Sequence, residues 1–114
     1  MAYVNVLPSL QVESFNDTVD WYERLFARAP DRRPMDGCVE WQLASTGGFQ
    51  VYRNPDGAAP ATVIIGLDDL ATEIEALRTR GIHAEPYDVP SGQFRLAQIQ
   101  DPSGNTVILS QDLS

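Results

Sequence analysis

Apolar and polar positions follow two different periods along this chain, and the order of those periods predicts its elements. A period of two is typical of strands and covers residues 3–10, 39–44, 49–53, 61–67, 83–89, 94–100 and 106–110. A period near 3.6 predicts helices over residues 17–27 and 69–80, the second ending at Gly81. The segment 28–37 contains Pro30 and Pro34, so we expect a short edge strand or an irregular loop there.

The two predicted helices follow one pattern. Matching positions lie 52 residues apart, namely Asp17 and Asp69, Tyr22 and Ile74, and Leu25 and Leu77. This constant offset, with the same order of strands around each helix, indicates a duplicated βαβββ unit. We therefore predict an α+β fold in a single domain, with units over residues 1–54 and 61–114 and a turn-rich link over 55–60.

The stretch 94–109 predicts two strands joined by a turn of defined chemistry. Asp101 can bond its own backbone, and Pro102 sets φ at the first corner. Gly104 then allows the positive φ that lets the second strand start. We expect a β-hairpin here, with a register fixed by its turn.

Composition narrows the classes of function. At 114 residues, the chain has the length of one domain, and its formal net charge of -8 argues against nucleic acid, because phosphate binding requires a basic face. No apolar run approaches the roughly 20 residues of a membrane helix, and no export pattern begins the chain, so we expect a cytoplasmic protein without a membrane partner. The single cysteine, Cys38, and the single histidine, His83, allow neither an intramolecular disulfide nor a histidine-rich metal site.

The chain resembles the glyoxalase/bleomycin resistance/extradiol dioxygenase superfamily, also called vicinal oxygen chelate. The resemblance rests on the duplicated unit, on the helix segment Val-Asp-Trp-Tyr-Glu-Arg-Leu-Phe at 19–26 and on the turn Asp-Pro-Ser-Gly-Asn at 101–105. It covers nearly the whole chain. It implies that each unit curls into a four-stranded sheet and that the sheets form a cleft, often at a dimer interface.

Enzymes of this superfamily hold a metal ion with His, Gln or Glu at four strand positions. The resemblance aligns these positions with Leu7, Gln50, Thr62 and Ile108. Leu and Ile have no lone pair to offer and Thr is a poor ligand, whereas a divalent ion requires three or more good donors. This departure favours the bleomycin-resistance branch, whose members are metal-free dimers that sequester an antibiotic. Pro8 fits that branch, in which a first-strand proline helps to exchange the strand between subunits; an edge-strand proline without that role is the alternative.

We predict that the hairpin of residues 39–53 forms one wall of the cleft. If Gln50 faces the cleft, alternation places Tyr52 beside it, and an even-length connection over 45–48 pairs Trp41 with Tyr52. The wall then carries Val39, Trp41, Leu43, Gln50 and Tyr52, which suits a flat, mostly apolar ligand. Two alternatives stay open: an odd-length turn reverses the faces of one strand, or Trp41 and Tyr52 form an ordinary cross-strand pair in a closed core.

The second unit is expected to supply another wall. The same parity across the turn at 101–105 pairs Ile108 with Gln98 and puts Leu96 and Phe94 on the Ile108 face. Relatives often place an aromatic side chain over the ligand, and the resemblance puts that position at Gln93. Gln93 or Phe94 is therefore expected to fill this role.

The first functional hypothesis is a metal-free homodimer that sequesters an aromatic, cationic antibiotic and confers drug resistance, with no catalytic residue and no cofactor. The alternative is a metal-dependent lyase, isomerase or dioxygenase of the same superfamily, or a metal-free enzyme that uses a cleft carboxylate. A binding module of unrelated purpose that kept only the fold is the third. No serine has a histidine placed to activate it, which argues against a serine nucleophile.

Overall fold

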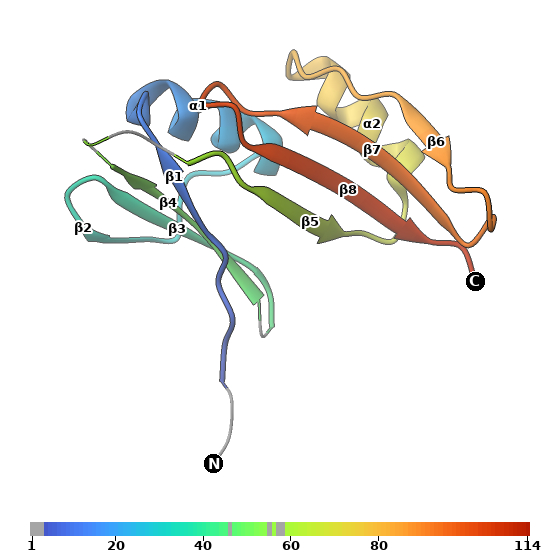
Figure 1. Ribbon diagram of the computed structural model, residues 1–114, viewed down its shortest axis with the longest axis horizontal. Coiled ribbons are helices and arrows are strands. Elements are labelled where there is room, and N and C mark those ends of the chain that lie inside the picture. Colours follow the sequence, from blue (N-terminus) through green and yellow to red (C-terminus); the bar gives the residue numbers. More distant parts are fainter. Residues whose placement is uncertain (1–3, 46, 55, 57–58) are drawn as a thin grey trace.

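The computed structural model describes residues 4–45, 47–54, 56 and 59–114. The first unit contains β1 (Ser9–Val12), α1 (Phe15–Phe26), β2 (Arg32–Met35), β3 (Cys38–Ala44) and β4 (Gly47–Arg53). The second unit contains β5 (Thr62–Gly66), α2 (Leu70–Thr79), β6 (Pro86–Asp88), β7 (Phe94–Gln100) and β8 (Thr106–Asp112) (Figure 1). The order strand, helix and three strands occurs twice, which confirms the predicted duplication and the α+β class.

Each unit forms one four-stranded mixed sheet that stays open. The strand orders are β1-β4-β3-β2 and β5-β8-β7-β6. In both sheets the first strand runs parallel to the last strand of its unit, and the other pairs are antiparallel. β1 and β5 are therefore edge strands, and β2 is the short edge strand expected between the first helix and β3.

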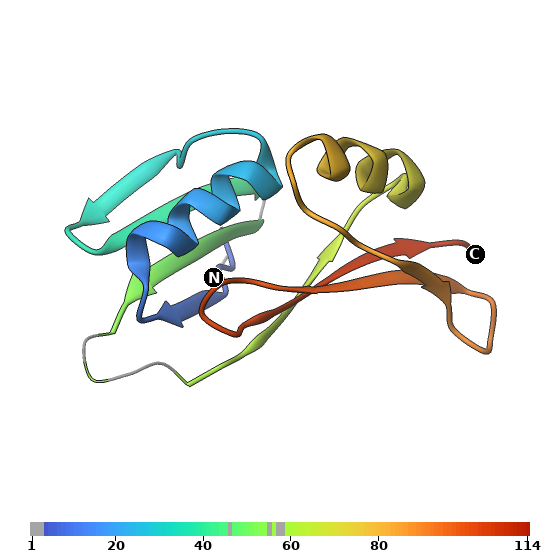
Figure 2. The same ribbon diagram turned by 90° about the horizontal axis from the view of Figure 1, so that it is seen from above.

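One helix covers one face of each sheet. Figure 2 shows α1 lying along the first sheet and α2 along the second. The buried side of α1 includes Tyr22 and Leu25, and that of α2 includes Ile74 and Leu77, as the apolar period predicted. These side chains join residues of both units in one buried apolar cluster. No helix in the described part of the chain is long and apolar enough to cross a membrane.

The first strand begins later than its sequence pattern predicts. β1 covers Ser9–Val12, and before it an isolated bridge joins Val6 to Gly47 and the Pro8 carbonyl oxygen accepts from the Gln50 amide nitrogen. Pro8 has no amide hydrogen to donate, which is consistent with regular pairing beginning after it. Residues 4–8 are called the N-terminal arm below. Tyr3 of the predicted strand, and Pro55, Gly57 and Ala58 of the predicted link, lie outside the described residues.

The register between β3 and β4 also differs from the expectation. Trp41 pairs with Phe49 rather than Tyr52, and Gln50 pairs with Glu40. Because the shift from Tyr52 to Phe49 is odd, the side chains of β3 lie on the face opposite to the predicted one. The predicted pairing of Trp41 with Tyr52 is therefore wrong.

A β-bulge near the end of β3 causes the reversal. Ala44 pairs with Gly47, which keeps an even-length connection. The next pair joins Gln42 to Gly48, so Leu43 is an extra residue on β3. One extra residue has the same effect on the faces as an odd-length turn.

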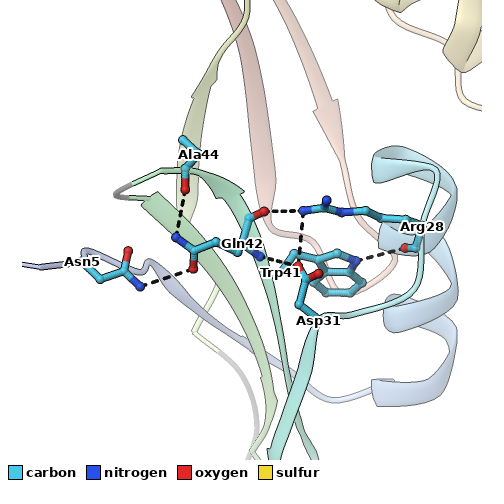
Figure 3. A network of polar contacts seen from close by, with 6 residues as sticks. All are labelled: Asn5, Arg28, Asp31, Trp41, Gln42 and Ala44. Atoms are coloured by element: carbon cyan, nitrogen blue, oxygen red, sulfur yellow. Dashed lines mark hydrogen bonds and ion pairs between the residues drawn. The ribbon is translucent and has the colours of Figure 1, made fainter.

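Side chains from the connection between α1 and β2 hold this bulged end of β3 (Figure 3). Asp31 Oδ2 accepts a hydrogen bond of 2.7 Å from the Gln42 amide nitrogen, and Arg28 donates to the Gln42 carbonyl oxygen. The Trp41 indole nitrogen donates to the Arg28 carbonyl oxygen over 3.1 Å. Both main-chain groups of Gln42 are thus bound by side chains, so they need no continued ladder.

The hairpin of β7 and β8 confirms the predicted turn and register. Gln98 pairs with Ile108, as the parity argument required. The Asp101 amide nitrogen donates to the Asn105 carbonyl oxygen at 2.9 Å, and Gly104 has a φ of 89°. The Asp101 carboxylate accepts from the amide nitrogen of Ser103, which is the side-chain-to-backbone bond expected of this turn.

Candidate functional site

Each sheet has one face that its helix leaves uncovered, here called its open face. On β4 the side chains of Phe49 and Val51 are buried toward α1, while Gln50 and Tyr52 lie on the open face. In the second sheet Val107 is buried toward α2, and its neighbour Ile108 lies on the open face. The open faces are the surfaces on which a ligand can meet regularly spaced side chains.

The open face of the first sheet carries a polar row that crosses all four strands. Ser9 of β1 donates from its hydroxyl to Gln50 Oε1. Gln50 Nε2 donates over 2.9 Å to Glu40 Oε2. Arg32 Nη2 of β2 lies 2.9 Å from Glu40 Oε1. Each side chain of the row therefore has a partner on the neighbouring strand, and the row orients the Glu40 carboxylate.

The open face of the second sheet carries several large apolar side chains among polar ones. Ile64 of β5 pairs with Ile108 of β8, and Tyr87 of β6 pairs with Leu96 of β7. Ile64 is 66% exposed, and Tyr87 and Phe94 are also exposed. Large apolar side chains exposed on an uncovered face indicate a surface for a ligand or a partner.

A groove of about 630 Å³ lies between the two units. Its apolar lining comes from the N-terminal arm, the end of β3 and the β5 segment, and includes Val6, Pro8, Leu43, Ile64 and Leu67. Arg28 and Glu73 add one charge of each sign. Because β5 is an edge strand, the groove also borders main-chain groups that lack a strand partner on that side in the described part of the chain.

The predicted wall residues divide among these surfaces. Gln50 and Tyr52 share the open face of the first sheet, and Thr62, Phe94 and Ile108 share that of the second. Their roles in ligand binding stay predictions.

The other predicted residues lie elsewhere. Val39 and Trp41 are buried under α1, so their assignment to the cleft wall rested on the wrong face of β3. The Trp41 ring packs at a steep angle against Phe26 and Phe49 in the core, with centroids 5.3 Å and 6.3 Å away. Leu43 lines the groove at the bulge, and Gln93 lies in the exposed loop before β7.

The residues at the four chelating positions of the superfamily do not fit a metal ion. Leu7 and Ile108 have no donor atom, and Thr62 offers one neutral hydroxyl. The oxygen of the Gln50 amide already accepts from Ser9. Among the described residues, no group of three His, Cys, Asp or Glu side chains is placed to hold a metal. We therefore derive no chemistry through a metal at these positions.

Cys38 lies beside the polar row of the first sheet. Its thiol has little chemical reactivity there. It pairs with Tyr52, which places it on the open face, yet its side chain is buried. Burial, with a smaller effect of the Glu40 carboxylate, raises the pKa of the Cys38 thiol. The thiol is therefore protonated at neutral pH and is a poor nucleophile.

Ser9, Arg32, Glu40 and Ile64 are site residues that the sequence reasoning did not select. Ser9 is two residues from Leu7, which the resemblance aligns with a chelating position, and it pairs directly with Gln50. The buried residues Leu10 and Val12 are a signal that could have found it, since alternation then places Ser9 on the open face. Glu40 lies on the open face because of the bulge in β3, and no local pattern in the sequence revealed that bulge.

Comparison with known proteins supports the fold. Neither a protein-family model nor a curated protein sequence matches the chain. Among solved structures, a glyoxalase/bleomycin resistance protein from Catenulispora acidiphila has a TM-score of 0.86 at 22% identity, covering 95% of this chain and 97% of that one. A bleomycin resistance determinant encoded on the transposon Tn5 has a TM-score of 0.79 at 23% identity, covering 96% and 98%.

A bleomycin-binding protein in complex with bleomycin is similar as well. Its TM-score is 0.76 at 22% identity, and the match covers 95% of this chain and 98% of that one. These proteins share nearly the whole length of the chain and both of its βαβββ units. The fold implied by the helix segment and the turn is thus confirmed: this chain has the fold of the glyoxalase/bleomycin resistance proteins.

Proposed function

We propose that the protein is a metal-free homodimer of the cytoplasm that binds an aromatic, cationic antibiotic and sequesters it without changing it. The observation that carries the proposal is the contrast between the open faces: one exposes the large apolar side chains of Ile64, Phe94 and Tyr87 among polar ones, and the other holds a hydrogen-bonded row with a carboxylate. An apolar surface with few oriented polar groups is typical of a small-molecule site. The similarity in fold to bleomycin-binding proteins supports the same reading.

A second copy of the chain is proposed to complete the cleft. The exposed apolar side chains on the open face of the second sheet, and the edge of β5 that is unpaired among the described strands, are features that folded proteins usually cover. In a symmetric homodimer, each protomer covers the same surface of its partner through one interface. Sedimentation velocity of the purified protein should give the mass of a dimer at micromolar concentration, and a monomer over the whole concentration range would contradict this part of the proposal.

The ligand-binding part is tested by calorimetric titration of chelator-treated protein with bleomycin and a panel of other aromatic, cationic antibiotics. We expect saturable binding, and we expect mass spectrometry to recover the ligand unchanged. Phe94→Ala should weaken binding, whereas Arg78→Met, which truncates an exposed side chain on α2 and so on the covered side of the second sheet, should not.

Two results would reject the proposal. One is binding that occurs only after Zn²⁺, Ni²⁺ or Fe²⁺ has been added. The other is recovery of a chemically altered ligand. Either result would favour the enzyme alternative of the same superfamily.

A further inference from the structure

Glu40 differs from the other carboxylates of ion pairs in how little of it meets solvent. Its side chain is 13% exposed, whereas that of Arg32, its ion-pair partner, is 66% exposed. The Gln50 amide binds Oε2, while Oε1 is buried and faces Arg32 Nη2 at 2.9 Å. A buried carboxylate that keeps its charge requires a close cation. The structure therefore holds an oriented anion whose cationic partner is largely exposed to solvent.

Arg32 is suited to leave this position. It lies on β2, a short edge strand whose four residues are all exposed. Its guanidinium keeps most of its contact with water, so moving it into solvent loses little besides the ion pair. The partner that replaces it can be any cation that reaches Oε1 from the open side.

A hollow of about 490 Å³ gives access to this carboxylate. It is lined by Arg32, Arg33, Pro34 and Glu40. Tyr52 lies on the same open face, two pairs along the ladder from Gln50 and Glu40, where its ring can flank an aromatic ligand. The net charge of -8 adds a long-range attraction for cations.

We infer that Glu40 recognises the cationic head group of the ligand, an ammonium or amidinium that donates to Oε1 in place of Arg32. The inference rests on the proposed function, because it names the part of the ligand that the open face of the first sheet selects. In this scheme Gln50 and Ser9 act as positioning residues, since they hold the carboxylate through Oε2. Arg32 is a competitor of the ligand.

Three probes of one shape and different charge test the inference: benzamidine, which is cationic at neutral pH, benzamide, which is neutral, and benzoate, which is anionic. Binding is followed in ¹⁵N-labelled protein by the side-chain amide signals of Gln50. We expect benzamidine to bind about tenfold more tightly than benzamide, the size of one charge-assisted hydrogen bond. Glu40→Gln should abolish this preference and leave benzamide binding unchanged.

Two further variants complete the design. Arg32→Gln should strengthen benzamidine binding several-fold because it removes the competing cation. Asp20→Asn removes the same charge as Glu40→Gln from an exposed ion pair on α1, and it should keep the preference for benzamidine.

Equal binding of benzamidine and benzamide, tightest binding of benzoate, or an unchanged preference in Glu40→Gln would overturn the inference alone. Failure of all three probes, together with failure of the antibiotic panel, would overturn the proposed function with it. Weaker benzamidine binding in Arg32→Gln would show that Arg32 supports the site rather than competes for it, and would also overturn the inference.

Discussion

The Tyr22 hydroxyl donates a hydrogen bond of 2.8 Å to Asp101 Oδ2, and both side chains are buried. Tyr22 belongs to α1 of the first unit and Asp101 to the β7–β8 turn of the second. The other oxygen of Asp101 accepts from the amide nitrogens of Ser103 and Asn105. The helix segment and the turn that carried the resemblance therefore form one interaction, which joins the two halves of the fold.

This hydrogen bond predicts how stability depends on alkaline pH. Burial, with the negative charge of Asp101 added, raises the pKa of Tyr22. In the unfolded chain a tyrosine ionises near about pH 10, so above that pH the unfolded state has lost a proton that the folded state keeps. The contribution of neutral Tyr22 to the free energy of unfolding is fully present below about pH 10. It falls by about 1.4 kcal/mol per pH unit above that pH.

Tyr22→Phe should remove this part of the alkaline decline and should cost about 1–3 kcal/mol at neutral pH, because it takes one donor from a buried carboxylate. Urea unfolding between about pH 8 and about pH 11 measures both effects. Tyr87→Phe, at an exposed tyrosine of the second sheet, is the matched control and should leave the pH profile unchanged. An identical alkaline slope in Tyr22→Phe and the natural chain would disprove the assignment.

Arg80 connects the end of α2 to the end of α1. Its guanidinium donates to the carbonyl oxygens of Arg24 and Leu25, which belong to the last turn of α1, and Glu73 holds it at 3.2 Å. Carbonyls at a helix end lack partners within the helix, so a cation there stabilises it. Arg80→Met should lower the free energy of unfolding by about 1 kcal/mol.

Arg78→Met is the control for this prediction. Arg78 lies in the same turn of α2 but pairs only with the exposed Glu75 of its own helix, at 3.2 Å. Exposed pairs of this kind contribute little, so denaturant unfolding should show a change below about 0.5 kcal/mol. Equal losses in the two variants would mean that the contact between the helices does not stabilise the fold.

Ala27 ends α1 in the left-handed region, with φ 59° and ψ 31°. Its amide nitrogen donates to the Glu23 carbonyl oxygen, as in a helix that ends on a glycine. A side chain in this region is strained by roughly 1 kcal/mol relative to glycine. Ala27→Gly should therefore stabilise the protein and raise its Tm, whereas Ala76→Gly within α2 should lower Tm by a similar amount. A lower Tm in Ala27→Gly would contradict the strain.

A substitution at Gly104 tests the backbone conformation of the turn without introducing a steric clash. It has a φ of 89°, and a methyl group added there would meet no atom within 4 Å. Gly104→Ala should therefore cost only the backbone strain, about 1–2 kcal/mol. Gly66→Ala, which also adds a methyl group in open space but at a φ outside the left-handed range, should be close to neutral in the same thermal unfolding experiment.

Local signals in the sequence determined most of the fold. The apolar stripes placed both helices to within two residues of their ends, and the Asp101 turn fixed the pairing of Gln98 with Ile108. These features depend on residues a few positions apart, since helix period, capping and turn chemistry act over short distances. The duplication then followed from the repeated order of the elements.

Only the tertiary structure decided which side chains of β3 lie on the open face of the first sheet. Alternation within a strand is local, but its phase relative to the next strand changes with one extra residue. That residue is Leu43, and the bulge is held by Arg28 and Asp31 through the main chain of Gln42. The result places Trp41 in the core and Glu40 on the open face, because side chains distant in sequence supply the partners that a regular ladder would have supplied.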